Sequence, residues 1–313
     1  MKKHNFVFSL LLATVLMLSA CTNGTENQTD NNAGNNKTDD GKVTVGLSIS
    51  TQNNPFFVTL KDGAQQAAKD AGVALTVLDA QDDTAKQISD IEDLIQKNVD
   101  VILINPTDSD AVVTAVESAN AANIPVITID RAANGGTVVT HIASDNVKGG
   151  SMAGEYILEA LGGKGNIVEL QGIAGTSAAR DRGEGFHQAV DGKDNVKVAA
   201  SQPADFDRAQ GMTVMENILQ SNKDIQAVFA HNDEMALGAL QAIEAANRKD
   251  ILVVGFDATD DAVNAVNAGT MSATVAQKPD AIGKQSIETA VKVAAGESVE
   301  SVIPVDLELV TKP

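Results

Sequence analysis

Short apolar runs typical of β-strands alternate with segments of helical spacing along most of this chain. Residues 43–50 alternate apolar with small or polar residues, which is the pattern of a half-buried strand. Residues 101–104 and 251–254 are continuously apolar, as expected of parallel strands buried on both faces. Apolar residues in 88–94 and 112–119 recur instead at helical spacing. Further strand-like runs lie near 74–79, 99–105, 125–130, 166–170, 196–200, 227–230, 251–256 and 273–276.

This alternation predicts an α/β fold with doubly wound parallel sheets. About ten strands in one twisted sheet would be unusual, and residues 42–313 are long for one domain. We therefore predict two Rossmann-like lobes. No linker rich in Gly, Ser or Pro interrupts these residues, so the chain must pass between the lobes through short ordered segments. Several such passages make a hinge, and the cleft beneath a hinge is a natural ligand site.

The first twenty residues have the pattern of a secretory signal peptide. Lys2 and Lys3 precede an apolar run at 6–18, and small residues follow it. The run is shorter than the about 18 apolar residues of a membrane-spanning helix. Residues 18–21 resemble a bacterial lipobox, in which Cys21 becomes the lipid-modified first residue. A soluble export signal with an incidental cysteine is the alternative, but a lone exposed thiol is a liability in an exported protein.

Residues 21–41 are predicted to be the lipidated cysteine and a flexible tether. They are rich in Asn, Thr, Asp and Gly and nearly lack apolar residues, so they cannot bury a core. About twenty such residues reach about 25 Å. The tether and lipobox favour an extracytoplasmic protein that is lipid-anchored to the cell membrane, in an envelope of the Gram-positive type.

The charge of the chain argues against nucleic acid as a partner. It carries 42 acidic and 23 basic residues, a formal net charge of −19. Removal of residues 1–20 takes away Lys2 and Lys3 and no acidic residue, which makes the mature charge −21. Nucleic-acid-binding domains carry a basic footprint instead. Cys21 is the only cysteine, so no intramolecular disulfide is possible.

The segment 51–57 follows the first predicted strand and opens the first predicted helix. It contains Asn54, Phe56 and Phe57. In an open α/β sheet, ligands bind at this carboxyl edge of the strands. An amide donates and accepts hydrogen bonds at once, and aromatic rings offer flat apolar faces. This combination suits a small, neutral, hydroxyl-rich molecule such as a sugar.

Polar or aromatic residues follow the other predicted strands as well. Carboxylates, amides and guanidinium groups are planar and can contact two adjacent hydroxyls. If two lobes place these residues on facing rims, they form one site. The residues are Asn105, Asp130, Arg131, residues 144–146, the segment 172–182 with Arg182, Phe206, Asn232, Asp233, Asp257 and Gln277.

Each of these residues also has a purely structural interpretation. Asp, Asn and Ser before a helix commonly cap it, which is the favoured role for Asp108, Asp110, Asn146 and Asp233. Asn105 with the proline after it can form a simple turn. Asp130 with Arg131 can be a surface ion pair of little energetic value, and Phe206 can be a core residue. The functional interpretation depends on the whole collection of residues.

Several segments resemble the bacterial ribose-binding proteins, the class of sugar-binding proteins that serves membrane ABC importers. The resemblance extends from about residue 43 to 309. The segments that carry it are 53–57, 104–110, 141–146, 172–180, 183–186, 201–207 and 232–238.

The resemblance implies two lobes that close on one sugar and are joined by three crossings. Lobe 1 would comprise residues 42–144 plus 278–306, and lobe 2 residues 145–277 plus 307–313. The partners implied are D-ribose or a similar monosaccharide, an ABC permease with its ATPase complex, and the membrane through the lipid anchor only. We expect a monomer without a cofactor. The implied sugar-binding residues are Asn54, Phe56, Phe57, Asn105, Asp130, Arg131, Arg182, Phe206, Asn232, Asp257 and Gln277.

Other functions are less consistent with the sequence. The P-loop, the Gly-x-Gly-x-x-Gly fingerprint and the nucleophile elbow are absent, and His141, His187 and His231 lack metal-ligand spacing. We therefore expect no enzymatic activity. A sugar-responsive transcription regulator would need a basic helix-turn-helix where this chain has its export signal. The alternatives that stay open are another sugar (allose, xylose, a galactose-type hexose or a furanose signal) and a role as partner of a membrane sugar sensor.

Overall fold

The computed structural model describes residues 41–312. The predicted signal peptide at 1–20, the lipid-modified Cys21 and the tether up to residue 40 lie outside the described residues. Within 41–312, no helix combines the length and the apolar composition that a membrane crossing requires.

The strands form two six-stranded sheets, which confirms the prediction of two α/β lobes. Sheet A is parallel throughout and has the order β11-β5-β4-β3-β1-β2. Its strands β3 and β4 are fully buried, as their continuous apolar sequences predict. The strands of sheet A are β1 (Thr44–Ile49), β2 (Ala74–Asp79), β3 (Val101–Ile104), β4 (Val126–Ile129), β5 (Thr140–Ser144) and β11 (Val302–Val305).

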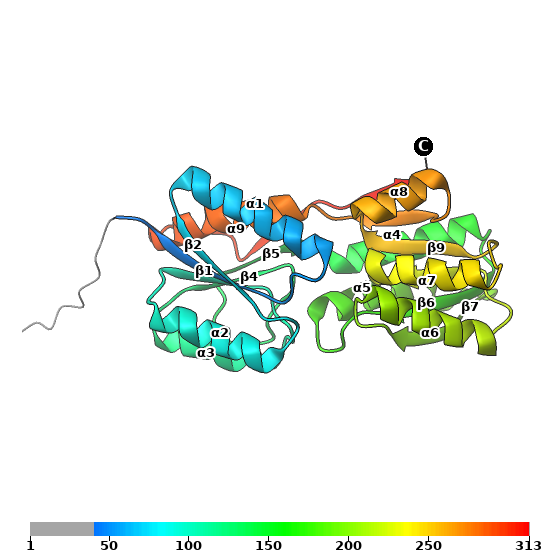
Figure 1. Ribbon diagram of the computed structural model, residues 1–313, viewed down its shortest axis with the longest axis horizontal. Coiled ribbons are helices and arrows are strands. Elements are labelled where there is room, and N and C mark those ends of the chain that lie inside the picture. The colour runs from blue at the N-terminus through cyan, green and yellow to red at the C-terminus, as the bar shows by residue number, and fades with distance from the viewer. Residues whose placement is uncertain (1–40, 313) are drawn as a thin grey trace, which may run out of the picture. The chain divides into compact units, whose positions relative to one another are not determined.

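Helices cover both faces of sheet A and complete lobe 1. Helices α1 (Pro55–Ala71) and α9 (Pro279–Ala294) pack together against one face, with Leu60 and Ile287 in the shared core. Helices α2 (Thr84–Gln96) and α3 (Val113–Ala121) cover the other face through Leu94 and Val116. The two helix pairs are visible above and below the sheet in Figure 1.

Sheet B has the order β12-β10-β9-β8-β6-β7 and is parallel except for β12, which pairs antiparallel with β10. The strands are β6 (Gly165–Gln171), β7 (Val196–Pro203), β8 (Ala227–Ala230), β9 (Leu252–Asp257), β10 (Ala273–Ala276) and β12 (Glu308–Thr311). Two helix groups cover it and complete lobe 2. One group is α4 (Asn146–Ala160) with α5 (Ser177–Val190), and the other is α6 (Arg208–Ser221), α7 (Asp233–Ala245) and α8 (Asp260–Ala268).

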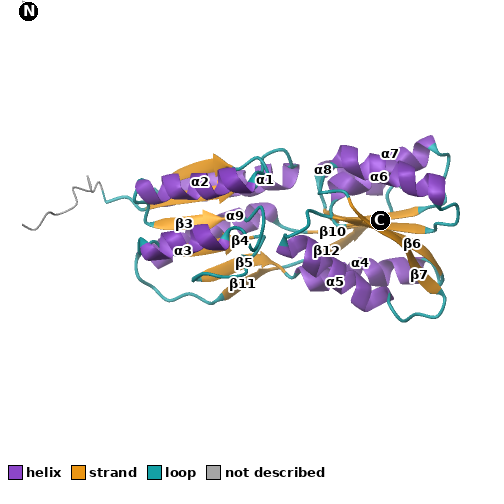
Figure 2. Cartoon of the chain, turned by 90° about the horizontal axis from the view of Figure 1, so that it is seen from below, coloured by secondary structure: helices purple, strands orange, loops and turns teal. Residues whose placement is uncertain are grey.

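The chain passes between the two sheets in three places, after β5, after β10 and after β11. Strands β11 and β12 follow one another in sequence, yet Figure 2 shows β11 beside β5 and β12 beside β10. The sequence pattern does not predict these two strands or β5. Each is short, and β11 contains Pro304, which is tolerated at a sheet edge because its missing N–H faces no partner strand.

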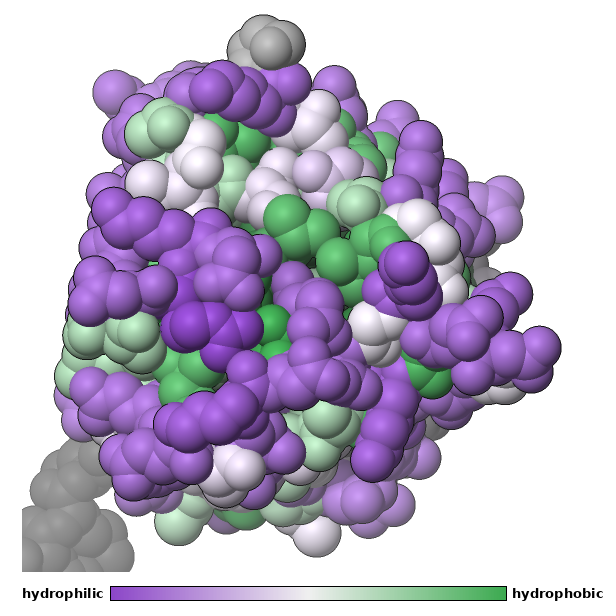
Figure 3. Space-filling model, turned by 90° about the vertical axis from the view of Figure 1, so that its right-hand side faces the viewer, coloured by the Kyte–Doolittle hydropathy of each residue, from purple (hydrophilic) through white to green (hydrophobic). Residues whose placement is uncertain are grey.

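The surface of the described residues is predominantly polar. Val302 is the one large apolar side chain among residues 41–312 that is extensively exposed. The face seen in Figure 3 shows apolar areas only as small islands between hydrophilic residues. The apolar side chains are instead buried in the cores on the faces of each sheet.

Candidate functional site

Side chains from both lobes line one small cavity. Nine of the eleven residues expected to bind a sugar meet there, and the tenth lining residue, Ala178, was expected only as part of the segment 172–182. Ala178 lies in the first turn of α5 and carries no polar group that could have indicated a role. The lining residues are Asn54, Phe56, Phe57, Asp130, Arg131, Ala178, Arg182, Phe206, Asn232 and Asp257.

The parallel strands explain why residues so distant in sequence meet. Asp130 directly follows β4, Asp257 ends β9, and Asn232 lies between β8 and α7. Each therefore lies at the carboxyl edge of its sheet, where the loops of a doubly wound fold converge. The predicted positions at the ends of strands thus correspond to neighbouring positions in space.

The two amide side chains in the cavity wall also cap the N-termini of helices. Asn54 Oδ1 accepts the N–H of Phe56 at 2.9 Å and caps α1. Asn232 Oδ1 accepts the N–H of Met235 at 3.0 Å and caps α7, while its Nδ2 donates to the carbonyl of Phe206 at 3.2 Å. Because each carbonyl oxygen is used by the helix, the orientation of both amides is set by the backbone.

Three residues of the cavity wall have left-handed backbones. The φ angles are 60° at Asp130, 59° at Phe206 and 117° at Asp257. Such conformations cost about 1–3 kcal/mol each in residues other than glycine and concentrate at functional sites. The tertiary structure therefore imposes the direction in which these three side chains point.

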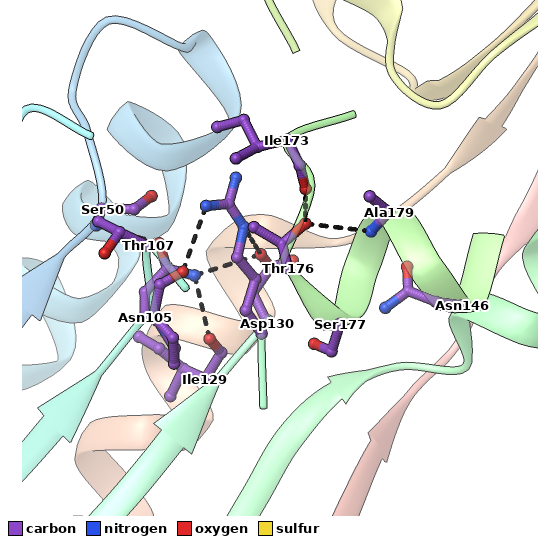
Figure 4. A network of polar contacts seen from close by, with 12 residues as sticks. Ser50, Asn105, Thr107, Ile129, Asp130, Asn146, Ile173, Thr176, Ser177 and Ala179 are labelled. Carbon is purple, nitrogen blue, oxygen red and sulfur yellow. Dashed lines mark hydrogen bonds and ion pairs between the residues drawn. The ribbon is translucent and has the colours of Figure 1, made fainter. Parts of the chain in front are cut away.

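The carboxylate of Asp130 has one oxygen paired and one unpaired. Its Oδ2 accepts Nδ2 of Asn105 at 3.3 Å, and its Oδ1 has no hydrogen-bond partner although it is buried. Figure 4 shows the Asn105 amide between Asp130 and the carbonyl of Ile129. Burial raises the pKa of Asp130, and the nearby Arg131 guanidinium offsets part of that rise. Asn105 itself does not line the cavity but lies behind the carboxylate and orients it.

Asp257 has a similar arrangement on lobe 2. Gln277 Nε2 donates to its Oδ1 at 2.9 Å, and Arg182 Nη1 lies 3.7 Å from the same oxygen. Gln277 Oε1 is buried without a partner. Gln277 likewise lies behind its carboxylate and does not line the cavity. Burial raises the pKa of Asp257 to about 7, although Arg182 opposes the rise.

Arg131 lies between aromatic rings of the two lobes. Its Cζ is 5.0 Å from the ring centroid of Phe57 and 5.2 Å from that of Phe206. Its Nε lies 3.9 Å from Asp130 Oδ2, too far for a hydrogen bond, and has no other acceptor. Burial lowers the pKa of Arg131, and Asp130 counters that effect. Both residues are 3% exposed, so the interpretation as a surface ion pair is wrong.

Several of the capping interpretations are also corrected. Asp145, not Asn146, caps α4, and Asn232, not Asp233, caps α7. Asp233 is fully buried and accepts hydrogen bonds from Thr259 and Thr274. Burial and the charge of Asp257 raise the pKa of Asp233 well above its usual range.

The other structural alternatives have mixed outcomes. Asp108 accepts the N–H groups of Asp110 and Ala111 in the turn before α3, so it stabilises that turn but does not cap the helix. Asp110 instead accepts a bond from Asn134, and α3 has no side-chain cap. Phe206 is 8% exposed and packs in the core of lobe 2 while also lining the cavity.

A buried ionic cluster supports the lobe 2 side of the cavity. His231 Nε2 and Glu169 Oε1 are 3.0 Å apart, and Nδ1 of His231 accepts the N–H of Gly172 at 3.4 Å. The proton of His231 therefore resides on Nε2, and burial lowers the pKa of this histidine. Burial works against ionisation of Glu169, yet the hydrogen bonds from His231 and Ser201 hold its pKa at about 2. His231 immediately precedes Asn232, so the cluster stabilises the backbone that carries that residue.

The lobes also meet through direct contacts beside the cavity. The loop after β3 contacts the loop between β6 and α5, and Ser109 and Ser177 are both buried there. The N–H of Ser109 donates to the carbonyl of Gly175 at 3.0 Å, and the N–H of Ala132 donates to Ser177 Oγ at 2.8 Å. Gly175 has a φ of 91°, and a Cβ there would lie 2.1 Å from Asp108 Oδ2.

Chemically, the cavity is a set of polar groups between flat apolar surfaces. Two carboxylates can accept hydrogen bonds from hydroxyls, two arginines can donate hydrogen bonds, and amides can do both. Buried polar atoms are normally paired, so the unpaired Asp130 Oδ1 and Arg131 Nε in the cavity wall point to a polar ligand. In residues 41–312, no cluster of three or more His, Cys, Asp or Glu side chains is arranged to hold a metal ion.

Comparison with known proteins assigns the family. A family model described as a periplasmic binding protein domain matches residues 45–298. The chain is 58% identical over 271 residues to the ribose import binding protein RbsB of Escherichia coli K12, which covers 87% of this chain and 91% of that protein. It is 51% identical over 304 residues to the protein of the same name from Bacillus subtilis 168, which covers 97% of both.

Solved structures agree with that assignment. A periplasmic solute binding protein from Actinobacillus succinogenes with bound D-allose superimposes with a TM-score of 0.82 at 33% identity, covering 87% of this chain and 98% of that one. A solute binding protein from Bacillus halodurans with bound myo-inositol gives a TM-score of 0.82 at 36% identity, covering 86% and 94%. The chain therefore belongs to the periplasmic binding protein family.

Proposed function

We propose that this protein captures D-ribose in the cavity between its lobes and delivers it to an ABC permease. The observation that carries the proposal is the cavity itself, where the unpaired Asp130 Oδ1 and Arg131 Nε of one lobe and polar side chains of the other line a space between aromatic rings. A small cavity lined by charged and amide side chains between aromatic rings favours a small polar ligand. The 51–58% identity to ribose import binding proteins supports ribose as that ligand.

The roles of the site residues follow from their chemistry. Asp130 and Asp257 would each accept hydrogen bonds from two sugar hydroxyls, and Arg131 and Arg182 would donate hydrogen bonds to oxygens of the sugar. Asn105 and Gln277 would orient the two carboxylates and share in the network. Hydrogen bonds to charged groups contribute about 1.5–3 kcal/mol each, so several of them support micromolar or tighter affinity after the cost of ordering the lobes. Phe56, Phe57 and Phe206 would cover the apolar faces of the ring, and Asn54 and Asn232 would contact hydroxyls.

The protein would act by closing and not by catalysis. The lobes would be residues 42–144 plus 278–306 and residues 145–277 plus 307–313, with the three crossings between the sheets as the hinge. Closure around the sugar would exclude water and strengthen each polar contact. The permease would recognise the closed form, and the sugar would leave unchanged.

The location of the protein follows from its amino terminus. After removal of residues 1–20, Cys21 would carry a lipid and residues 22–41 would tether a monomeric body to the outer face of the cell membrane. A Gram-positive type of envelope, which lacks a free periplasm, fits such an anchor. Mass spectrometry of the membrane fraction would detect a diacylglyceryl Cys21, and an unmodified or secreted protein would contradict the anchor.

A second candidate is a different small sugar with the same mechanism. Solved relatives include proteins with bound D-allose and with arabinofuranose, at 33% identity each. Allose, xylose, a galactose-type hexose or a furanose signal would satisfy the same set of donors and acceptors. Relay of the bound state to a membrane sensor is compatible with any of these ligands.

Thermal unfolding of the purified, ligand-stripped protein with a panel of pentoses and hexoses tests the proposal. A ligand at 100 times its dissociation constant stabilises the folded state by about 2.7 kcal/mol, or roughly 5–10 °C. A shift with ribose alone supports the proposal. A shift only with another sugar would replace the ligand, and the absence of any shift would contradict sugar binding altogether. Recovery of each sugar unchanged after incubation separates binding from catalysis.

A further inference from the structure

Arg182 is anchored on three sides by residues of its own lobe. Its Nε donates to Oδ1 of Asn146 at 2.8 Å, and its Nη1 donates to the carbonyl of His231 at 2.6 Å. Its Cζ lies 3.9 Å from the ring centroid of Phe256. The guanidinium is buried yet lines the cavity, so these contacts decide which of its N–H groups face a ligand. Of the three, Asn146 supplies the only side-chain acceptor.

Asn146 is not needed to cap α4, which is the role that its position at the start of the helix suggests. It is the first residue of α4, but the carboxylate of Asp145 already caps that helix by accepting the N–H of Lys148 at 2.9 Å. The side chain of Asn146 is 7% exposed and does not line the cavity. Figure 4 shows it beside the first turn of α5, close to Ala179. Its buried oxygen is therefore directed at Arg182 and away from the helix end.

Asn146 also lies at the first crossing between the lobes. Strand β5 of sheet A ends at Ser144, and α4 of lobe 2 starts two residues later. The residue that holds Arg182 is thus part of the segment where the chain leaves lobe 1. Asn146 also offers a neutral acceptor, which orients the guanidinium without neutralising it. The charge of Arg182 remains available for Asp257, 3.7 Å away, and for a ligand.

We propose that Asn146 is a positioning residue for sugar binding that acts through Arg182. This inference rests on the proposed function and extends it to a residue outside the cavity wall. Loss of the acceptor frees the guanidinium to rotate and leaves a buried N–H without a partner, which weakens its bonds to the sugar. A neutral acceptor bonded to a charged donor at this distance is strong enough for a tenfold effect.

The first test measures ribose affinity by calorimetry for Asn146→Ala and for Asp145→Ala in the full chain. We expect Asn146→Ala to lose affinity about tenfold or more. Asp145→Ala is the matched control, because it removes a cap from the same helix start without touching Arg182. It should lower the melting temperature by about 2–4 °C and leave affinity unchanged. Equal affinities of wild type and Asn146→Ala would overturn the inference.

A double-mutant cycle separates positioning from a general structural role. In an Arg182→Ala background, adding Asn146→Ala should change affinity less than twofold, because the residue through which Asn146 acts is gone. Additive losses would show that Asn146 acts independently and would contradict the proposal. Asn146→Asp keeps an acceptor at the same position but adds a charge that pairs with the guanidinium, so its affinity should lie between those of wild type and Asn146→Ala. A loss equal to or larger than that of Asn146→Ala would also contradict the proposal.

The same experiments distinguish failure of this inference from failure of the ribose assignment. If the wild-type protein shows no response to ribose but responds to another sugar, the cycle is measured with that sugar, and the prediction for Asn146 is unchanged. If wild type binds ribose and the Asn146 variants bind it equally well, only the positioning role is wrong.

Discussion

The backbone N–H of Ser177, at the start of α5 in lobe 2, donates to Oγ of Ser109 in lobe 1 at 3.1 Å. The two further bonds between Ser109 and Gly175 and between Ala132 and Ser177 surround it. All three join protein groups to protein groups, and none uses a residue of the cavity wall. The closed arrangement of the lobes therefore has contacts of its own, so a bound sugar need not supply all of the free energy of closure.

Substitution of Gly175 should weaken sugar binding by disturbing this contact. A Cβ at Gly175 would collide with Asp108 of the other lobe, and its φ of 91° is unfavourable for alanine. We expect Gly175→Ala to reduce ribose affinity several-fold, measured by calorimetry. The control is Gly192→Ala, whose φ is 73° but whose Cβ would meet nothing within 4 Å. It should cost about 1 kcal/mol of stability without changing affinity, and equal affinity losses in both variants would contradict the role of the contact.

Removal of either charged group that faces the cavity should lower affinity strongly. Asp130→Ala removes an unpaired acceptor, and Arg182→Ala removes a buried donor. Each should reduce ribose affinity at least tenfold, since hydrogen bonds to charged groups contribute about 1.5–3 kcal/mol. Asp250→Ala, an exposed acid that pairs with Arg248, serves as the control and should bind like wild type. Near wild-type affinity in both cavity variants would rule out this site.

Sugar affinity should fall as the pH is lowered below about 7. Burial raises the pKa of Asp257 to about 7 in the protein without ligand. Hydroxyl donors favour the ionised carboxylate, so its pKa in the complex is lower, and binding below pH 7 releases a proton. Affinity should decrease up to tenfold per pH unit below that value and be flat above it.

Calorimetry in buffers of different ionisation enthalpy measures the released proton. Asp257→Asn should reduce the release by about one proton, although Asp130, whose pKa burial also raises, titrates in the same direction. The charge of Asp257 also raises the pKa of the neighbouring Asp233, so the titrations of the two carboxyl groups depend on each other. Proton uptake on binding, or a pH-independent affinity, would contradict this prediction.

Glu169 should stabilise the fold at neutral pH and lose that effect in acid. Its pKa is lowered to about 2 from an ordinary value of 4.5. The stabilisation is complete above pH 4.5 and disappears as the pH falls toward 2, amounting to about 3 kcal/mol at pH 7. Urea unfolding of Glu169→Gln should show a deficit of this order at pH 7 and less than half of it at pH 3. A deficit that is equal at both pH values would assign the loss to packing instead of charge.

The strand pattern of the sequence was sufficient to predict the two lobes, because buried parallel strands leave continuous apolar runs. Strands β5, β11 and β12 escaped this pattern. Their residues are few and partly polar, and β11 and β12 lie at sheet edges, where only pairing with a distant strand defines them. Sheet membership of such segments depends on tertiary contacts that no local periodicity records.

The sequence predicted which strand ends form the candidate site. It did not predict which residues at those ends line the cavity and which lie behind it. A residue after a strand can line the cavity, as Asp130 does, or lie behind it, as Asn105 and Gln277 do. Likewise, a polar residue before a helix is recognisable as part of a cap, but Asn146 and Asp233 each lie one position past the true cap. Of two adjacent polar residues, one caps the helix and the other bonds to residues outside it, and the sequence does not show which is which. The role of the candidate site residues in sugar binding stays a prediction.

The double use of Asn54 and Asn232, as helix caps and as parts of the cavity wall, limits how the site can be redesigned. Substitution of either asparagine would destabilise the fold and alter the cavity at once. A screen for binding could then not distinguish variants that fail to fold from variants that fold but do not bind the sugar. Phe56 and Ala178 line the same cavity without capping a helix. Engineering toward a new sugar should therefore begin at those two positions and leave both asparagines unchanged.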